Sequence, residues 1–196
     1  QKQEIAQAHR NLLYVLASQG LYAYHPNDRS IRTFDKVNGL ADAAIAHISY
    51  NTSAHRLVVV YVNGNIDLLD DDGQVTHLSA YRDARLTADK TVNSICQHGS
   101  DAFLATGFGI VRLNVARAEV SDTYQLHCPV AYCWVERQLL KAASPTAGML
   151  QCPLNSNLAD PLSWQHTGAF VAQTPVDNTA LWAKVAQVSP DGPAYN

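Results

Sequence analysis

Short stretches of alternating apolar and polar residues recur along the chain, and a glycine interrupts each of them. They run from Leu12 to Pro26, from Leu57 to Gly73, from Ala102 to Asn114 and from Leu139 to Pro153. In each stretch an apolar run reaches the glycine, and a second alternating run follows it. Alternation with a period of two residues is typical of β-strands. The pattern therefore predicts a series of β-hairpins.

The glycines of these hairpins are evenly spaced. They are Gly20, Gly64, Gly109 and Gly148, so the intervals are 44, 45 and 39 residues. A repeat of about 40 to 45 residues matches one four-stranded blade of a β-propeller. Helical repeats with periods near 33 or 34 residues need long segments of 3.6-residue periodicity, which the sequence does not show. We therefore predict an all-β propeller of four-stranded antiparallel blades.

The third unit shows how a blade divides into strands. We expect strands at Thr91–His98, Asp101–Gly107, Gly109–Asn114 and Ala118–Leu126, separated by short turns. A phosphate-binding loop would need a helix after the glycines, with its N-terminus facing the phosphate. An alternating strand follows Gly109 instead. The glycine pair of "ATGFGIV" is therefore predicted to form a hairpin turn.

Four full blades and the start of a fifth fit within the chain, which we take as a single propeller region over residues 1–196. The blades cover approximately 5–37, 45–79, 91–126 and 130–167, and the fifth would begin in 169–196. Ala180–Lys184 is expected to be the second strand of that fifth unit. Propellers close with typically four to eight blades. We therefore expect four to five blades here, as part of a larger protein.

Composition and charge exclude several classes of protein. The 196 residues are 47% hydrophobic and 16% charged, with a net charge of −3. Lys and Arg are scattered, so no basic patch suggests nucleic-acid binding. The longest apolar run, Leu57–Val62, is far shorter than the roughly 20 residues of a transmembrane helix. The opening "QKQEIAQAHR" contains no cleavable signal, as in a mature exported protein.

Cysteine and histidine are the residue types that could form a metal or redox centre. The cysteines, Cys96, Cys128, Cys133 and Cys152, form no C-x-x-C pair. We expect them to be buried or free thiols, with a disulfide as the alternative in an oxidising compartment and metal ligation as the last possibility. The histidines are dispersed without H-x-H or H-E-x-x-H spacing. They are His9, His25, His47, His55, His77, His98, His127 and His166.

The other candidate motifs also favour structural roles. The acidic segment Asp67–Gly73 lacks the ligand spacing and the following Glu of a calcium loop, so we interpret it as a solvated turn. Aromatic residues lie mostly on predicted strands and are expected to pack between blades, with a minority left for a sugar- or lipid-binding surface on loops. No G-x-S-x-G motif is present. We assign no catalytic, metal or cofactor-binding residue and expect no cofactor.

Three segments together resemble the N-terminal propeller of the PorZ family. They are Asn38–Asp70, Thr91–Asn114 with "EVSDTY" after it, and Leu154–Trp164, and the most specific parts are "YVNGNIDLL" and "ATGFGIV". The resemblance implies a non-enzymatic component of type IX secretion that works with the PorU sortase at the outer membrane and presents anionic lipopolysaccharide. Family members also carry a second propeller and a C-terminal β domain, which these residues do not include.

The leading prediction is thus an exported binding and assembly propeller, in the periplasm or at the outer-membrane cell surface. Its partners would be a PorU-like sortase and anionic lipopolysaccharide. Two alternatives stay open. The glycine-hairpin pattern is shared with periplasmic sensor propellers of hybrid two-component systems. A propeller glycosidase or lyase would need two carboxylates about 5 to 10 Å apart in one cleft.

Overall fold

Four antiparallel sheets follow one another along the chain, each with four strands in sequence order. The computed structural model describes residues 3–17, 20–41, 44–78 and 89–186. Within these residues the sheets are β1-β2-β3-β4, β5-β6-β7-β8, β12-β11-β10-β9 and β13-β14-β15-β16. We call them blades 1 to 4. Their topology confirms the predicted propeller fold of four-stranded antiparallel blades.

The strands and short helices have the following bounds. Blade 1 contains β1 (Glu4–Gln7), β2 (Leu13–Ala17), β3 (Gly20–His25) and β4 (Ser30–Phe34). Blade 2 contains β5 (Ile45–Asn51), β6 (Arg56–Tyr61), β7 (Ile66–Asp70) and β8 (Val75–Leu78). Blade 3 contains β9 (Val92–His98), β10 (Asp101–Thr106), β11 (Gly109–Asn114) and β12 (Glu119–Gln125). Blade 4 contains β13 (Tyr132–Glu136), β14 (Leu139–Ser144), β15 (Gly148–Pro153) and β16 (Gln165–Gly168). Single turns of 3₁₀ helix are η1 (His9–Asn11), η2 (Lys36–Asn38) and η3 (Pro161–Ser163), and the α-helix is α2 (Thr179–Ala186).

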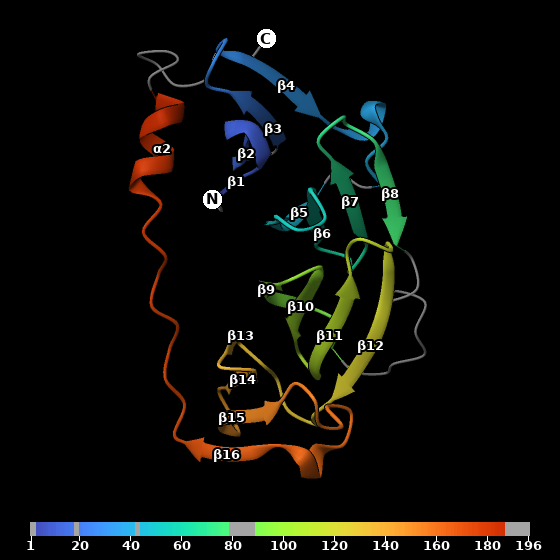
Figure 1. Cartoon of the computed structure of the whole chain (residues 1–196), viewed down its shortest axis with the longest axis vertical. Helices are drawn as coiled ribbons and strands as arrows, with labels where there is room; N and C mark the ends of the chain where they lie inside the picture. The colour runs from blue at the N-terminus through green and yellow to red at the C-terminus, as the bar shows by residue number, and fades with distance from the viewer. Residues whose placement is uncertain (1–2, 18–19, 42–43, 79–88, 187–196) are drawn as a thin grey trace.

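The blades form an open arc with their first strands on the inside. Figure 1 shows β1, β5, β9 and β13 along the inner side and β4, β8, β12 and β16 along the outer side. A polar contact joins three of the inner strands. Glu4 of β1 accepts a hydrogen bond from the backbone N–H of Ile48 at 2.7 Å, and its other carboxylate oxygen lies 2.9 Å from His47 Nδ1. His47 Nε2 in turn lies 3.0 Å from the carbonyl oxygen of Val92.

Apolar side chains fill the spaces between neighbouring blades. The apolar run of β6 shows how one strand serves two interfaces: Leu57 and Val59 face blade 1, and Val58 and Val60 face blade 3. All four side chains are completely buried. A strand buried on both faces needs a continuous apolar run rather than an alternating one. The third cluster lies between blades 3 and 4 and includes Phe103.

Glycines mark the hairpins between the second and third strands, as predicted. Gly20, Gly109 and Gly148 begin β3, β11 and β15, and Gly64 lies between β6 and β7. Gly109 has φ +150°, and a Cβ there would collide with the carbonyl oxygen of Tyr124. A side chain is therefore excluded on steric grounds. Since β11 begins at Gly109, the hairpin interpretation is correct.

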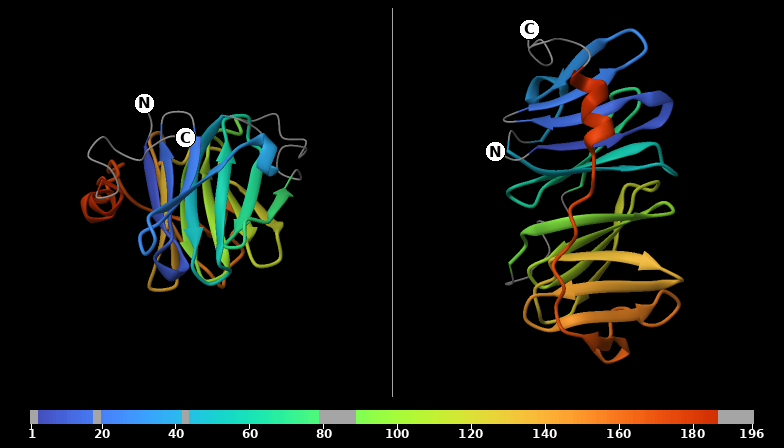
Figure 2. Two further views of the ribbon diagram at one scale, coloured as in Figure 1. Left: turned by 90° about the horizontal axis from the view of Figure 1, so that it is seen from above. Right: turned by 90° about the vertical axis from the view of Figure 1, so that its left-hand side faces the viewer.

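The strand predicted at Ala180–Lys184 is wrong, because these residues belong to α2. Residues 169–178 have no regular secondary structure, and Figure 1 and Figure 2 show them running from β16 across the open side of the arc to blade 1. Leu181, Trp182 and Val185 then form one helix face that packs on blade 1. Residues 187–196 of the predicted fifth unit, and residue 79 of the second, lie outside the described residues. Over the part that is described, the helices are too short or too polar to cross a membrane.

Candidate functional site

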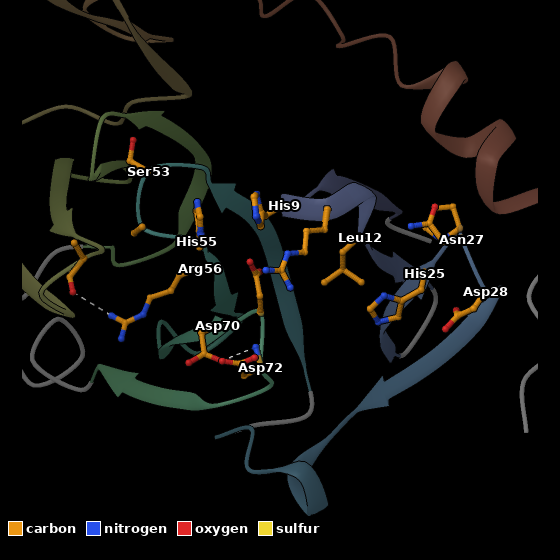
Figure 3. A pocket seen from close by; sticks show the side chains of 15 residues that line it. His9, Leu12, His25, Asn27, Asp28, Ser53, His55, Arg56, Asp70 and Asp72 are labelled. Carbon is orange, nitrogen blue, oxygen red and sulfur yellow. Dashed lines mark hydrogen bonds between the residues drawn. The ribbon is translucent and has the colours of Figure 1, made fainter.

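A groove of about 930 Å³ lies where the hairpin turns of blades 1 and 2 meet. In an antiparallel meander the turn between strands one and two lies at the same edge of the sheet as the turn between strands three and four. The groove therefore receives the β1–β2 and β3–β4 turns of blade 1 and the matching turns of blade 2 (Figure 3). Ala116, in the β11–β12 turn of blade 3, completes the lining.

Several of these turns hold side chains in the left-handed backbone region. Arg10, Asn11, Arg29 and His55 have φ between +53° and +61°. This conformation costs residues with a Cβ roughly 1–2 kcal/mol, and glycine adopts it freely. The chain thus carries large polar side chains where a glycine would be easier to accommodate. Arg10 and His55 are among the residues that line the groove.

Two histidines join the turns of blades 1 and 2. The rings of His9 and His55 stack with their centroids 4.5 Å apart and their planes 15° from parallel. Figure 3 shows them side by side at the groove, with His25, Asn27 and Asp28 of blade 1 nearby. The histidines were predicted to be dispersed, so this convergence was not predicted from the sequence. The signal was available, since positions 9 and 55 are separated by about one blade repeat and occupy equivalent turns.

A tyrosine network supports the base of the groove. The hydroxyl of Tyr50 lies 3.0 Å from both carboxylate oxygens of Asp71 and accepts a hydrogen bond from the backbone N–H of His9. Burial is the main cause that raises the pKa of Tyr50 to about 12, and Asp71 adds to it. The ring of Tyr14 stacks on that of Tyr50 at 6.2 Å, and burial raises the pKa of Tyr14 as well. Both phenols therefore remain neutral hydrogen-bond donors at physiological pH.

The remaining carboxylates order the turns and set the charge of the groove. Asp70 Oδ1 accepts hydrogen bonds from the backbone N–H groups of Asp72 and Gln74, each at 2.9 Å. Asp28 Oδ1 accepts one from the backbone N–H of Ser30, also at 2.9 Å. The lining contains four Asp and two Arg, an excess of two negative charges when the histidines are neutral. The groove can therefore accept hydrogen bonds from hydroxyl or cationic groups, and it disfavours anions.

The interpretation of Asp67–Gly73 as a solvated turn is wrong for its first three residues, because Asp67, Leu68 and Leu69 are buried on β7. Asp70–Gly73 do form the β7–β8 turn, but Asp67 lies on β7 with no exposed surface. Its carboxylate accepts hydrogen bonds from Tyr61 Oη at 2.6 Å and the backbone N–H of Ala41 at 2.8 Å, and lies 2.6 Å from His77 Nδ1. These partners compensate for burying a carboxylate. The sequence interpretation grouped Asp67 with the turn, although Leu68 and Leu69 separate it from Asp70.

A second polar surface lies on the outward sheet face of blade 4, which we call the blade-4 face. Tyr132, Trp134 and Glu136 occupy alternate positions of β13. Lys141 of β14 lies opposite Trp134, and Gln151 of β15 lies opposite Lys141. The rings of Tyr132 and Trp134 stack at 5.4 Å, and Lys141 Nζ lies 6.0 Å from the Trp134 ring. A minority of aromatic residues was expected at a surface on loops, whereas the exposed parts of Tyr132 and Trp134 lie on a strand.

Polar contacts hold the blade-4 face in place. Trp134 Nε1 and Lys141 Nζ both donate to Glu136 Oε2 at 3.3 Å, and these bonds lower the pKa of Glu136. Gln151 Nε2 donates to Oε1 of Gln165 on β16 at 3.1 Å. Lys141 is the third residue of β14, a position where β6 and β10 carry buried apolar residues that face the next blade. Blade 4 therefore presents a charge where the other blades present core.

The acidic and histidine side chains of the two surfaces are the groups that would ligate a metal ion there. Within the described ranges, no group of three or more His, Cys, Asp or Glu side chains could hold a metal ion. The groove carboxylates are engaged by turn amides and by Tyr50.

Comparison with solved structures shows similarity to several propellers. PorZ of Porphyromonas gingivalis, described as an essential surface component of the type IX secretion system, is 29% identical over 84% of this chain, with a TM-score of 0.76. This chain spans 22% of that PorZ chain. AztD of Citrobacter koseri (14% identity, TM-score 0.59, 87% of this chain and 47% of that one) shares the fold alone. The extracellular domain of a hybrid two-component system of B. thetaiotaomicron also shares the fold alone. It has 18% identity and a TM-score of 0.59, over 83% of this chain and 21% of that one.

The family comparison covers most of the described strands. No curated protein sequence matches the chain. The model of the N-terminal β-propeller domain of PorZ, from the type IX secretion system, matches residues 13–165. These residues extend from the first residue of β2 to the first residue of β16 and include the segments that carry the sequence resemblance. The chain therefore belongs to the family of PorZ N-terminal β-propeller domains of the type IX secretion system.

Proposed function

We propose that the chain is a non-enzymatic binding and assembly module, exported to the periplasm or the outer-membrane cell surface. In this proposal it works with a PorU-like sortase and presents anionic lipopolysaccharide for attachment to cargo proteins. The observation that carries the proposal is family membership across all four blades. The two polar surfaces described above differ in charge and shape, which supports one partner for each.

We assign the groove between blades 1 and 2 to the sortase. Its four Asp and two Arg make it net negative, so an anionic saccharide would be repelled. A basic or hydroxyl-bearing segment of a protein would be attracted, because complementary charge speeds association and fixes orientation. The stacked His9 and His55 rings add a flat apolar contact.

We assign the blade-4 face to the saccharide chain of the lipopolysaccharide. The partly exposed rings of Tyr132 and Trp134 offer flat apolar surface to sugar C–H groups. Gln151 and Gln165 supply amide donors and acceptors for sugar hydroxyls. The Lys141 ammonium, paired with Glu136 at 3.3 Å, has further N–H groups beside the rings that can donate to sugar hydroxyls or to an anionic substituent.

The test is a pull-down with the tagged, purified chain from outer-membrane extract of a bacterium with type IX secretion. The bound fraction is blotted for sortase and for anionic lipopolysaccharide. The expected result is recovery of both. Recovery of neither, in an extract where a known sortase-binding component captures its partner, would contradict the proposal.

Paired variants assign each partner to its surface. Asp28→Asn with Asp72→Asn should reduce sortase recovery several-fold and leave lipopolysaccharide recovery unchanged. Asp122→Asn on β12, which is exposed and does not line the groove, is the control. Trp134→Ala should reduce only lipopolysaccharide recovery, and Trp134→Phe should retain most of it because a ring remains.

The two alternatives have separate outcomes. Capture of soluble glycans without sortase or lipopolysaccharide would favour a sensor propeller. The support for that alternative is similarity of fold. A glycosidase needs a carboxylic acid whose pKa is raised. In the groove, hydrogen bonds from the Ser30 side chain and backbone lower the pKa of Asp28 instead. Hydrolysis of an oligosaccharide by the purified chain would be the observation in favour of the enzyme.

A further inference from the structure

Two thiols face each other across the boundary between blades 3 and 4. Cys96 lies on β9 and Cys133 on β13, the innermost strands of the two blades, and these strands pack side by side. Cys133 belongs to the apolar cluster between the blades, and Cys96 packs against that cluster. Cys133 Sγ lies 3.9 Å from the carbonyl oxygen of Phe103, the residue of β10 that pairs with Cys96. The two cysteines are therefore neighbours across the blade boundary, although they are far apart in sequence.

The two thiols are not equivalent. The hydrogen bond with Cys133 is the main cause that lowers the pKa of Cys96, and the same bond, with burial, raises the pKa of Cys133. Cys96 is also the more accessible of the two, since it is partly exposed while Cys133 is buried. The thiolate is the form that attacks disulfides. Cys96 is thus placed as the attacking thiol and Cys133 as the resolving thiol.

We propose that Cys96 and Cys133 form a disulfide that covalently joins blade 3 to blade 4 when the chain meets a small-molecule disulfide or a disulfide-bearing thiol oxidase. The Cys96 thiolate attacks one sulfur of the oxidant, which forms a mixed disulfide and releases the oxidant's second sulfur as a thiolate. The Cys133 thiol then loses its proton and attacks Cys96 Sγ, which expels the remaining oxidant thiolate. Overall, two protein thiols lose two protons and two electrons, and the oxidant becomes two thiols.

The other two cysteines provide the internal comparison. Cys152 is buried on β15, and burial raises the pKa of its thiol. Cys128 is buried in the connection between β12 and β13. We therefore expect Cys96 and Cys133, which lie on adjacent inner strands, to form the disulfide. Cys128 and Cys152 should remain thiols. The cross-link constrains the unfolded chain and should raise Tm by on the order of 5–10 °C.

The experiment oxidises the purified full chain with oxidised glutathione, blocks remaining thiols with N-ethylmaleimide, and maps unreduced peptides by mass spectrometry. We expect one linked peptide pair that joins Cys96 to Cys133, with Cys128 and Cys152 alkylated, and a Tm increase that a reductant reverses. Linkage of a different pair would overturn the proposal. So would recovery of alkylated Cys96 and Cys133, or of glutathione on Cys96 alone in the wild-type chain.

Two substitutions make the assignment specific. Cys133→Ser should stop the reaction at the mixed disulfide and leave glutathione on Cys96. Cys128→Ser should retain the cross-link and the Tm increase. Loss of the cross-link in Cys128→Ser would contradict the assigned pair. Because the wild-type peptide map needs no substitution, a poorly folded variant does not prevent the test.

Discussion

The two end blades of the arc each have one sheet face without a neighbouring blade, and these faces differ in chemistry and in cover. The outward face of blade 1 is apolar, with Leu13 and Val15 almost completely buried under α2. The blade-4 face carries Trp134, Lys141 and Glu136, which are partly or fully exposed. An apolar face requires cover because its exposure to water is unfavourable. A face of aromatic and charged groups can stay open and bind.

The C-terminal segment links the two end blades. It leaves blade 4 after β16, where the Tyr132 hydroxyl donates a hydrogen bond to the carbonyl oxygen of Val171 at 2.7 Å. It then crosses the open side of the arc and places α2 against blade 1 (Figure 2). The same segment therefore touches the edge of the open face and covers the apolar one. Four predictions test this contrast, from the largest expected effect to the smallest.

The first prediction compares one apolar side chain on each end face. Leu13→Ala should lower the free energy of unfolding by about 2–5 kcal/mol, because it leaves a cavity beneath α2. Met149→Ala on the blade-4 face should cost about 1 kcal/mol or less, since Met149 is partly exposed. Urea denaturation followed by circular dichroism measures both. Equal losses would show that the two faces are equally covered.

The second prediction tests α2 as the cover of blade 1. Val185→Asp should lower stability by about 2–4 kcal/mol, because it puts a carboxylate into the contact between helix and blade. The exposed apolar face should then bind the dye ANS. Lys184→Asp, at the exposed neighbouring position, is the control and should change neither property by much. ANS binding that is the same in the two variants would contradict the proposed role of α2.

The third prediction concerns the β13–β14 turn at the edge of the blade-4 face. Arg137 and Gln138 have φ of +51° and +63°, the geometry of a type I′ turn. Replacing them with Asn-Gly should increase the free energy of unfolding by roughly 0.5–1 kcal/mol, since these residues adopt positive φ more easily. Thermal unfolding measures the gain. A decrease would mean that the two native side chains make stabilising contacts.

The fourth prediction uses the pH dependence of the blade-4 face. Hydrogen bonds from Trp134 and Lys141 lower the pKa of Glu136. These hydrogen bonds therefore stabilise the folded chain above the ordinary pKa of Glu. Their contribution is lost as the pH falls through the lowered pKa of Glu136. The effect on unfolding should be small because Glu136 is exposed, but the fluorescence of Trp134 should change over that acid range. Glu136→Gln should abolish this change, and a wild-type-like titration in that variant would exclude Glu136 as its cause.

The strands were predictable because their signal is local. The third blade was expected at 91–98, 101–107, 109–114 and 118–126, and its strands lie within a residue of those limits. Alternation, turn residues and the glycine repeat all agree there. The failure at Ala180–Lys184 has a physical cause. Leu181 and Trp182 are adjacent in the sequence, and only Val185 adds a helical spacing to them. The local pattern therefore does not distinguish a helix from a strand. Contact with blade 1 decides the conformation.

The surfaces to which we assign binding depend on contacts between blades and could be predicted only in part. His9 and His55 meet because neighbouring blades place equivalent turns together, which a comparison of blade positions could have suggested. The blade-4 face was less predictable. Lys141 occupies a strand position that is core in blades 2 and 3, and the exposure of Lys141 and Trp134 follows from the absence of a neighbouring blade among the described residues.

The most direct test of the account is a fluorescence titration of the purified chain with purified anionic lipopolysaccharide. We expect a saturable change in Trp134 emission in the wild-type chain. We expect a strongly weakened affinity in Trp134→Ala, measured by a label-free method, while Asp28→Asn with Asp72→Asn binds as the wild type does. Equal affinity of wild type and Trp134→Ala would contradict the assignment of the saccharide to the open face of blade 4.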